Sequence, residues 1–160
     1  ELLVIPIQMA NLAAIIANHG YYYTPHFIKE VKGDTSGVLD EYKVRHRTMV
    51  DSVYFEPIIA AMQTVVENGT ARRARTKDIV VCGKTGTAEN PHGEDHSVFI
   101  AFAPRDNPQI AIAVYVENAG YGGTWAAPIS SLMIEKYLKR VVSDKFKEKR
   151  ILEKDFINEK

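Results

Sequence analysis

One short segment of this sequence sets an amine, two hydroxyls and a glycine side by side. The apolar run Asp78-Ile-Val-Val-Cys-Gly83 leads directly into Lys84-Thr-Gly-Thr87. On a strand edge, Lys84 can hold a proton network, and the hydroxyls of Thr85 and Thr87 can bind a carboxylate. Gly86 has no Cβ, so a substrate backbone can approach closely there. The segment predicts a binding edge, although a lysine on an edge strand can also serve only to prevent aggregation.

The composition argues against a nucleic-acid partner and excludes an intrachain disulfide. Of 160 residues, 46% are hydrophobic and 25% are charged, which is enough for one globular domain with a core. Twenty basic residues balance twenty acidic ones, so the basic excess of a typical nucleic-acid-binding protein is missing and we expect no nucleic-acid partner. The single cysteine, Cys82, cannot form an intrachain disulfide and lies in an apolar run, so we expect a buried thiol.

The pattern of apolar residues predicts an α+β fold, an antiparallel sheet flanked by helices. A helix is expected over residues 8–18, a second from Asp51 or Ser52 to an αL turn at Asn68-Gly69, and a third capped by Thr124. The expected strands are residues 26–31, 38–47, 79–87, 97–103 and 109–117. The turn at residues 104–108 makes the last two strands antiparallel neighbours.

The composition changes near Ser143. Residues 1–142 have the mixed pattern of a folded domain, whereas residues 143–160 are mostly charged and are expected to form a tail, either a frayed helix or a disordered segment. The opening residues resemble the middle of a domain, so we expect a part of the protein upstream of Glu1.

Two other chemistries fit the sequence less well. A phosphate-binding loop needs a glycine five positions before Gly83, where Asp78 stands, so Gly83-Lys84-Thr85 does not predict a nucleotide site. A zinc site of the metalloprotease type needs two histidines on one helix face, but Pro91 and Gly93 flank His92. We therefore expect residues 92–96 to be a polar loop, with no metal and no cofactor.

A basic stretch, Arg72-Arg-Ala-Arg75 with Lys77, is the best candidate in the sequence for binding a polyanion. No aromatic residues are interleaved with it, so a solvated link is the favoured interpretation. Its charges could still attract a substrate that carries carboxylates.

Four blocks of sequence, in order, resemble the transpeptidase domain of class B penicillin-binding proteins, and most closely its elongation-type branch, penicillin-binding protein 2. The blocks are residues 6–18, 65–71, 83–89 and 95–104, and the resemblance extends over about residues 1–140. It implies part of the fold shared by penicillin-binding proteins and serine β-lactamases. It also implies a peptidoglycan D,D-transpeptidase that cross-links stem peptides by serine acyl transfer and binds β-lactams.

The resemblance assigns roles to the Lys84 segment. Lys84 matches the lysine of the K-T-G motif, which orders the proton network around a serine of a second motif. Thr85 and Thr87 would bind the terminal carboxylate of a D-Ala-D-Ala stem peptide or of a β-lactam, and the N–H of Thr87 would help to stabilise the oxyanion. Gly86 would keep the strand open to the substrate.

The resemblance also implies partners and a location. The missing amino-terminal half of the domain would supply the acylating serine, and a membrane glycosyltransferase would act with the parent protein. The parent would be anchored in the bacterial cytoplasmic membrane by an amino-terminal helix outside this chain, with its catalytic domain on the periplasmic side. Two alternatives stay open on the same fold: a non-catalytic β-lactam sensor, and a β-lactamase or D,D-carboxypeptidase.

We predict that these 160 residues alone do not react with penicillin. None of the six serines has a lysine three positions later, so the acylating S-x-x-K motif is absent, as is the second motif, S-x-N. Intact mass spectrometry after incubation with a labelled β-lactam should show only the unmodified mass. A stoichiometric covalent adduct would contradict this expectation.

Overall fold

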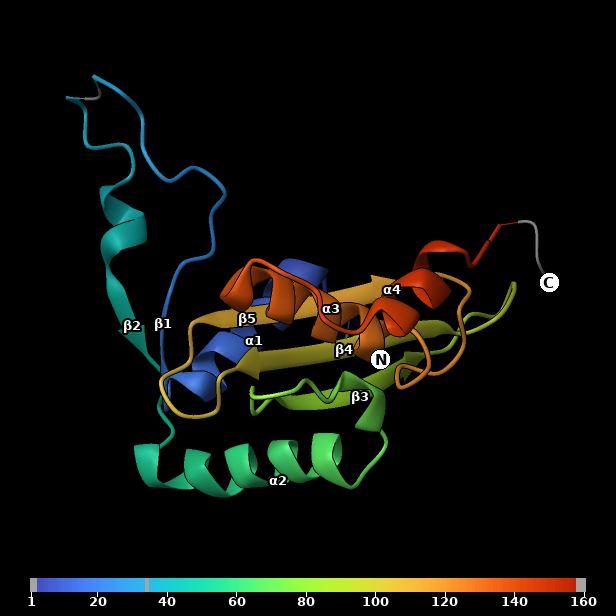
Figure 1. Cartoon of the computed structure of the whole chain (residues 1–160). Helices are drawn as coiled ribbons and strands as arrows, with labels where there is room; N and C mark the ends of the chain where they lie inside the picture. The colour runs from blue at the N-terminus through green and yellow to red at the C-terminus, as the bar shows by residue number, and fades with distance from the viewer. Residues whose placement is uncertain (1–2, 34, 158–160) are drawn as a thin grey trace.

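A three-stranded antiparallel sheet forms the centre of the computed structural model, which describes residues 3–33 and 35–157 (Figure 1). The strands are β3 (Cys82–Ala88), β4 (His96–Ala103) and β5 (Ile110–Val116), in the order β3-β4-β5. The expected hairpin between β4 and β5 is confirmed by their antiparallel register. β3 is therefore an edge strand of this sheet, with one side unpaired by any described strand.

Helices pack on both faces of the sheet because its strands alternate their side chains. Phe102 of β4 belongs to a buried cluster with α1 (Pro6–Ala17) and α2 (Phe55–Glu67), while its neighbour Ala103 belongs to a second cluster with α3 (Ala126–Lys139). The central strand is thus buried on both sides, which explains its nearly continuous apolar sequence. The α+β class predicted from the sequence is confirmed.

The helix ends agree with the sequence in part. α1 stops at Asn18, and the chain turns at His19 and Gly20, both with positive φ. Asp51 caps a short 3-10 turn, Ser52–Tyr54, by accepting a hydrogen bond from the Val53 N–H at 3.1 Å, and α2 follows. The expected Thr124 cap is wrong, since α3 begins after Trp125 and has no side-chain cap.

The expected αL turn at Asn68-Gly69 is also wrong, although α2 does end there. Asn68 has a φ of −129°, and Gly69 has no positive φ. The glycine is needed for space: a Cβ at Gly69 would lie 2.9 Å from the backbone of Val65, one turn earlier in the helix. An Asn-Gly pair at a helix end usually indicates a residue with positive φ, but here the glycine is required because there is no room for a Cβ.

An arm between α1 and α2 holds the largest difference from the predicted strands. β1 (Tyr21–Tyr23) and β2 (Arg45–Arg47) form a small antiparallel pair, and a 3-10 turn, Asp40–Lys43, precedes β2. The strand expected over residues 26–31 is absent, and only the end of the one expected over 38–47 forms. Figure 1 shows the arm rising away from the sheet; Phe27 is 93% exposed, and residues 26–31 pair with no strand in the described part of the chain.

The charged segment after Ser143 contains a helix, α4 (Lys145–Leu152), capped by Asp144, which accepts a hydrogen bond from the Lys147 N–H. Beyond α4, the Phe156 ring meets Trp125 edge-on at 5.0 Å. The buried Glu135 of α3 accepts hydrogen bonds from the N–H and hydroxyl of Ser143. Burial acts to raise the pKa of Glu135, but these hydrogen bonds and nearby lysines outweigh it, so the pKa is lowered and the carboxylate stays ionised.

No helix among the described residues has both the length and the apolar character needed to cross a membrane.

Cys82 provides a test of the core. Its side chain is fully buried, and burial raises the pKa of its thiol to about 12 from an ordinary 9.0, so the reactive thiolate is scarce at pH 8. We expect no reaction with Ellman's reagent at pH 8 until urea unfolds the chain. The fully exposed Met49 offers a control: a Met49→Cys, Cys82→Ala variant should react at once. Equal labelling rates for the two proteins would contradict the fold.

Candidate active site

The predicted binding segment occupies the edge strand. Lys84 pairs with Ile100 of β4, and Thr85 pairs with Phe99, so consecutive residues of the segment lie on opposite faces. The exposed Lys84 bends around the edge, and its Nζ donates a hydrogen bond to the carbonyl of Thr85 at 2.8 Å. An amine therefore lies at the edge that none of the described strands covers. An unpaired edge of this kind can accept an extended peptide as an added strand.

The two threonines open into a hollow of about 460 Å³. Thr85 shares a hydrogen bond of 2.9 Å with the hydroxyl of Thr70, which lies beyond the end of α2. The lining contains four threonines, two arginines and no acidic side chain: Thr70, Arg72, Arg73, Thr85, Thr87, Tyr121, Gly122, Gly123 and Thr124. Hydroxyl and guanidinium donors without a competing carboxylate favour the binding of an anion.

A glycine loop forms the opposite wall of this hollow. A Cβ on Gly122 would collide with the carbonyl oxygens of Gly86 and Val98, so only glycine allows the loop to lie this close to β3. The same test at Gly86 finds only ordinary contact, 3.4 Å from the Cβ of Val98. The protein's own packing therefore does not require glycine at position 86, which is consistent with a role in ligand approach.

A buried hydroxyl holds the glycine loop at both ends. Ser97 of β4 is fully buried, and its hydroxyl donates to the carbonyl of Tyr121 at 2.9 Å and accepts from the N–H of Ala126 at 3.1 Å. The Ser97 hydroxyl thus acts as both donor and acceptor, so its burial leaves no hydrogen-bonding group of the side chain unsatisfied. The loop that faces Thr85 and Thr87 is thus tied directly to the central strand.

Sequence reasoning found four of the residues at this edge and missed three. Lys84, Thr85, Gly86 and Thr87 do lie together on β3, as predicted. Thr70, Ser97 and Gly122 were not identified, because they come from a helix end, a second strand and a loop. The Gly-Tyr-Gly-Gly run at residues 120–123 and a serine opening an apolar strand were the available signals.

The other candidates lie elsewhere. Cys82 is buried with a raised pKa, which agrees with the predicted inert thiol. His92 lies in the β3–β4 turn, and His96 opens β4, where its ring accepts a hydrogen bond from the Asn118 N–H at 3.1 Å. The polar loop expected over residues 92–96 therefore runs into a strand at its end.

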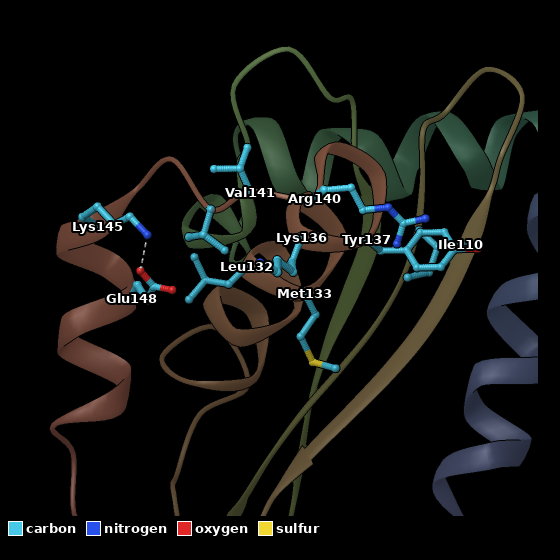
Figure 2. Close-up of a pocket in the computed structure, with 10 residues that line it drawn as sticks. Ile110, Leu132, Met133, Lys136, Tyr137, Arg140, Val141, Lys145 and Glu148 are labelled. Carbon is cyan, nitrogen blue, oxygen red and sulfur yellow. Dashed lines mark hydrogen bonds and ion pairs between the residues drawn. The ribbon is translucent and has the colours of Figure 1, made fainter.

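A larger hollow between α3 and α4 has a different character. Figure 2 shows its lining, which includes Leu132, Met133, Tyr137 and Val141, with an ion pair of 2.8 Å between Lys145 and Glu148 at one side. No residue of β3 lines it. Its charged side chains, Lys136, Arg140, Lys145 and Glu148, include an acid and lie around an apolar floor, so it lacks the acid-free set of hydroxyl and guanidinium donors found at β3.

Comparison with known proteins agrees with this geometry. The sequence profile described as "Penicillin binding protein transpeptidase domain" matches residues 2–135. The chain belongs to this family. Relatives in the family include the peptidoglycan D,D-transpeptidase MrdA of Haemophilus influenzae, 33% identical over 164 residues, which cover 84% of this chain and 24% of that protein. The peptidoglycan D,D-transpeptidase PbpA of Mycobacterium tuberculosis is 35% identical over 150 residues, with 84% and 29% covered.

Solved structures of penicillin-binding proteins have the same fold. Penicillin-binding protein 2 of Pseudomonas aeruginosa, in complex with WCK 5153, aligns with a TM-score of 0.72 and 31% identity over 89% of this chain and 32% of that one. The imipenem acyl-enzyme complex of penicillin-binding protein A from M. tuberculosis gives a TM-score of 0.70 and 30% identity, with 84% and 31% covered. The chain spans less than a third of the length of each of these relatives.

Gly122→Ala should push the glycine loop off β3, because the added methyl meets backbone that cannot rotate away. We expect a loss of about 1–3 kcal/mol in the free energy of unfolding in urea, as overpacking usually costs. Gly93→Ala is the matched control, since its Cβ would meet only two asparagine side chains at 3.2 Å, which can move. Equal stabilities for the two variants would contradict the close approach of the loop.

Proposed function

We propose that this chain forms the K-T-G wall of the active site in a peptidoglycan D,D-transpeptidase of the elongation type. The proposal is supported chiefly by the acid-free hollow in which Thr85 and Thr87 lie beside a free strand edge with Lys84 on it. The substrate would be a stem peptide ending in D-Ala-D-Ala, and β-lactams would occupy the same edge. Similarity to MrdA and PbpA transpeptidases favours this function over a sensor or a hydrolase of the same fold.

Three residues of the segment then have roles in the reaction. The hydroxyls of Thr85 and Thr87 donate hydrogen bonds to the terminal carboxylate of the peptide, which fixes the scissile bond along β3. The backbone N–H of Thr87 stabilises the oxyanion of the tetrahedral intermediate, a contact worth about 3–4 kcal/mol in comparable sites. Lys84, at the open edge, orders the proton network around a hydroxyl supplied from outside this chain.

The reaction is acyl transfer in two steps. A serine oxygen attacks the carbonyl of the penultimate D-alanine, an ester forms, and the terminal D-alanine leaves with the proton. The amine of a neighbouring peptide then attacks the ester, forms the cross-link and returns the proton to the serine. Because no S-x-x-K occurs in these residues, the serine would come from another part of the protein.

The proposal extends to the setting of the whole protein. By analogy with its relatives, the parent would act in the periplasm, attached to the cytoplasmic membrane by a helix outside this chain, beside a glycosyltransferase that makes the glycan strands. Similarity to peptidoglycan transpeptidases along most of the chain supports this setting.

Lys84→Ala in the complete protein tests the assignment. Loss of a group that organises proton transfer should slow acylation by a fluorescent penicillin by roughly two to four orders of magnitude. The fold should be unaffected, because the side chain is exposed and packs against little. Lys32→Ala, which removes an exposed lysine from the distant arm, is the matched control. Normal labelling of a folded Lys84→Ala protein would refute the role of Lys84.

A further inference from the structure

Two hollows meet at Arg72 and Arg73. Both arginines line the threonine hollow on β3, and both also line a second hollow of about 320 Å³. The second hollow adds three more cations and a single acid to its lining: Arg75, Pro128, Asp144, Phe146, Lys147 and Arg150. The cationic surface therefore continues without a break from the carboxylate-binding edge toward α4.

The arginine segment is held by its backbone and leaves its charges free. Ala71 and Ala74 are fully buried, which fixes the 3-10 turn Arg72–Ala74 against the core. The Nε of Arg72 donates to the carbonyl of Asn68 at 3.1 Å, and the Nε of Arg75 donates to that of Val66 at 3.3 Å. None of the three arginines, Arg72, Arg73 and Arg75, forms an ion pair with a carboxylate in the described part of the chain.

The tail helix brings two further cations from about 70 residues away in the sequence. The Nζ of Lys147 donates to the carbonyl of Arg75 and to the hydroxyl of Ser131, each at 3.1 Å, so α4 is joined directly to the arginine segment. Burial lowers the pKa of Lys147, and the carboxylates of Asp144, at 3.8 Å, and Glu135 offset part of this effect. Arg150 stacks over the Trp125 ring at 4.5 Å.

Five cations line this surface with one carboxylate, Asp144, and Glu135 acts on Lys147 without lining the hollow. Because like charges at short range repel, such a surface favours the binding of an anion. Guanidinium groups also match the planar, two-oxygen geometry of a carboxylate. The shared lining places such an anion beside the terminal carboxylate held by Thr85 and Thr87. A peptide with a second acidic group could therefore span both hollows.

We propose that Arg72 and Arg73, supported by Arg75, Lys147 and Arg150, bind a second carboxylate of an acidic peptide substrate. This inference rests on the proposed function, since it takes the first carboxylate to lie at Thr85 and Thr87. The site gives the enzyme a preference for a peptide with a free internal carboxylate over its carboxamide. The tail helix is then part of the substrate site.

The test uses the complete protein and two synthetic peptides that end in D-Ala-D-Ala. They differ only in one internal group, a carboxylate or a carboxamide, and kcat/KM is measured by release of D-alanine. The wild-type protein should favour the carboxylate peptide by roughly tenfold or more, as charged hydrogen bonds usually allow. An Arg72→Ala, Arg73→Ala double variant should bring the ratio close to one, mainly through the KM of the carboxylate peptide.

Lys77→Ala is the matched control, since it removes a nearby exposed cation that lines neither hollow, and its ratio should equal that of the wild type. A ratio that survives the double variant would overturn the inference. Equal losses with both peptides would also overturn it, because the arginines would then serve the first carboxylate. Failure of the proposed function is distinct: neither peptide would release D-alanine even with the wild-type protein.

Discussion

The antiparallel register between β3 and β4 is the constraint on which the rest of this structure depends. Phe99 and Phe102 of β4 are fully buried on opposite faces of the sheet, so the strand cannot slide without exposing one of them. Gly83 restricts the register further, because only a residue without a Cβ can lie against the Phe99 ring at this position. A slip of one residue would exchange the faces of Lys84 and Thr85 and dismantle the binding edge.

The second wall of the site inherits its position from the same strand. Ser97 is the residue of β4 opposite Thr87, and its buried hydroxyl ties the glycine loop at Tyr121 and Ala126. The loop can then approach β3 closely only because Gly122 lacks a side chain. The hydroxyl of Ser97 and the missing side chain of Gly122 thus determine the width of the hollow beside Thr85 and Thr87, which apolar packing alone would not fix.

Charge is organised on a larger scale than the net value suggests. The chain as a whole is neutral, yet Arg72, Arg73 and Arg75 meet Lys147 and Arg150 around a single acid, Asp144. A second carboxylate, Glu135, also acts on Lys147, but it is buried, holds the start of the tail at Ser143 and does not line the hollow. A neutral protein can therefore still present a strongly cationic surface on one side.

The sequence by itself determined the central sheet, the three main helices and the K-T-G edge, because these depend on local periodicity and on one contiguous motif. Prediction from the sequence failed where the structure depends on contacts between residues that are distant in the chain or on adjacent turns of a helix. Residues 26–31 have strand-forming composition but pair with none of the strands that the structure describes, and Gly69 reflects contact with Val65 where an αL turn was expected. Only the tertiary structure brought Thr70, Ser97 and Gly122 to the Lys84 strand and α4 to the arginine segment. These contacts join residues 10 to about 70 positions apart, and no spacing in the sequence encodes such distances.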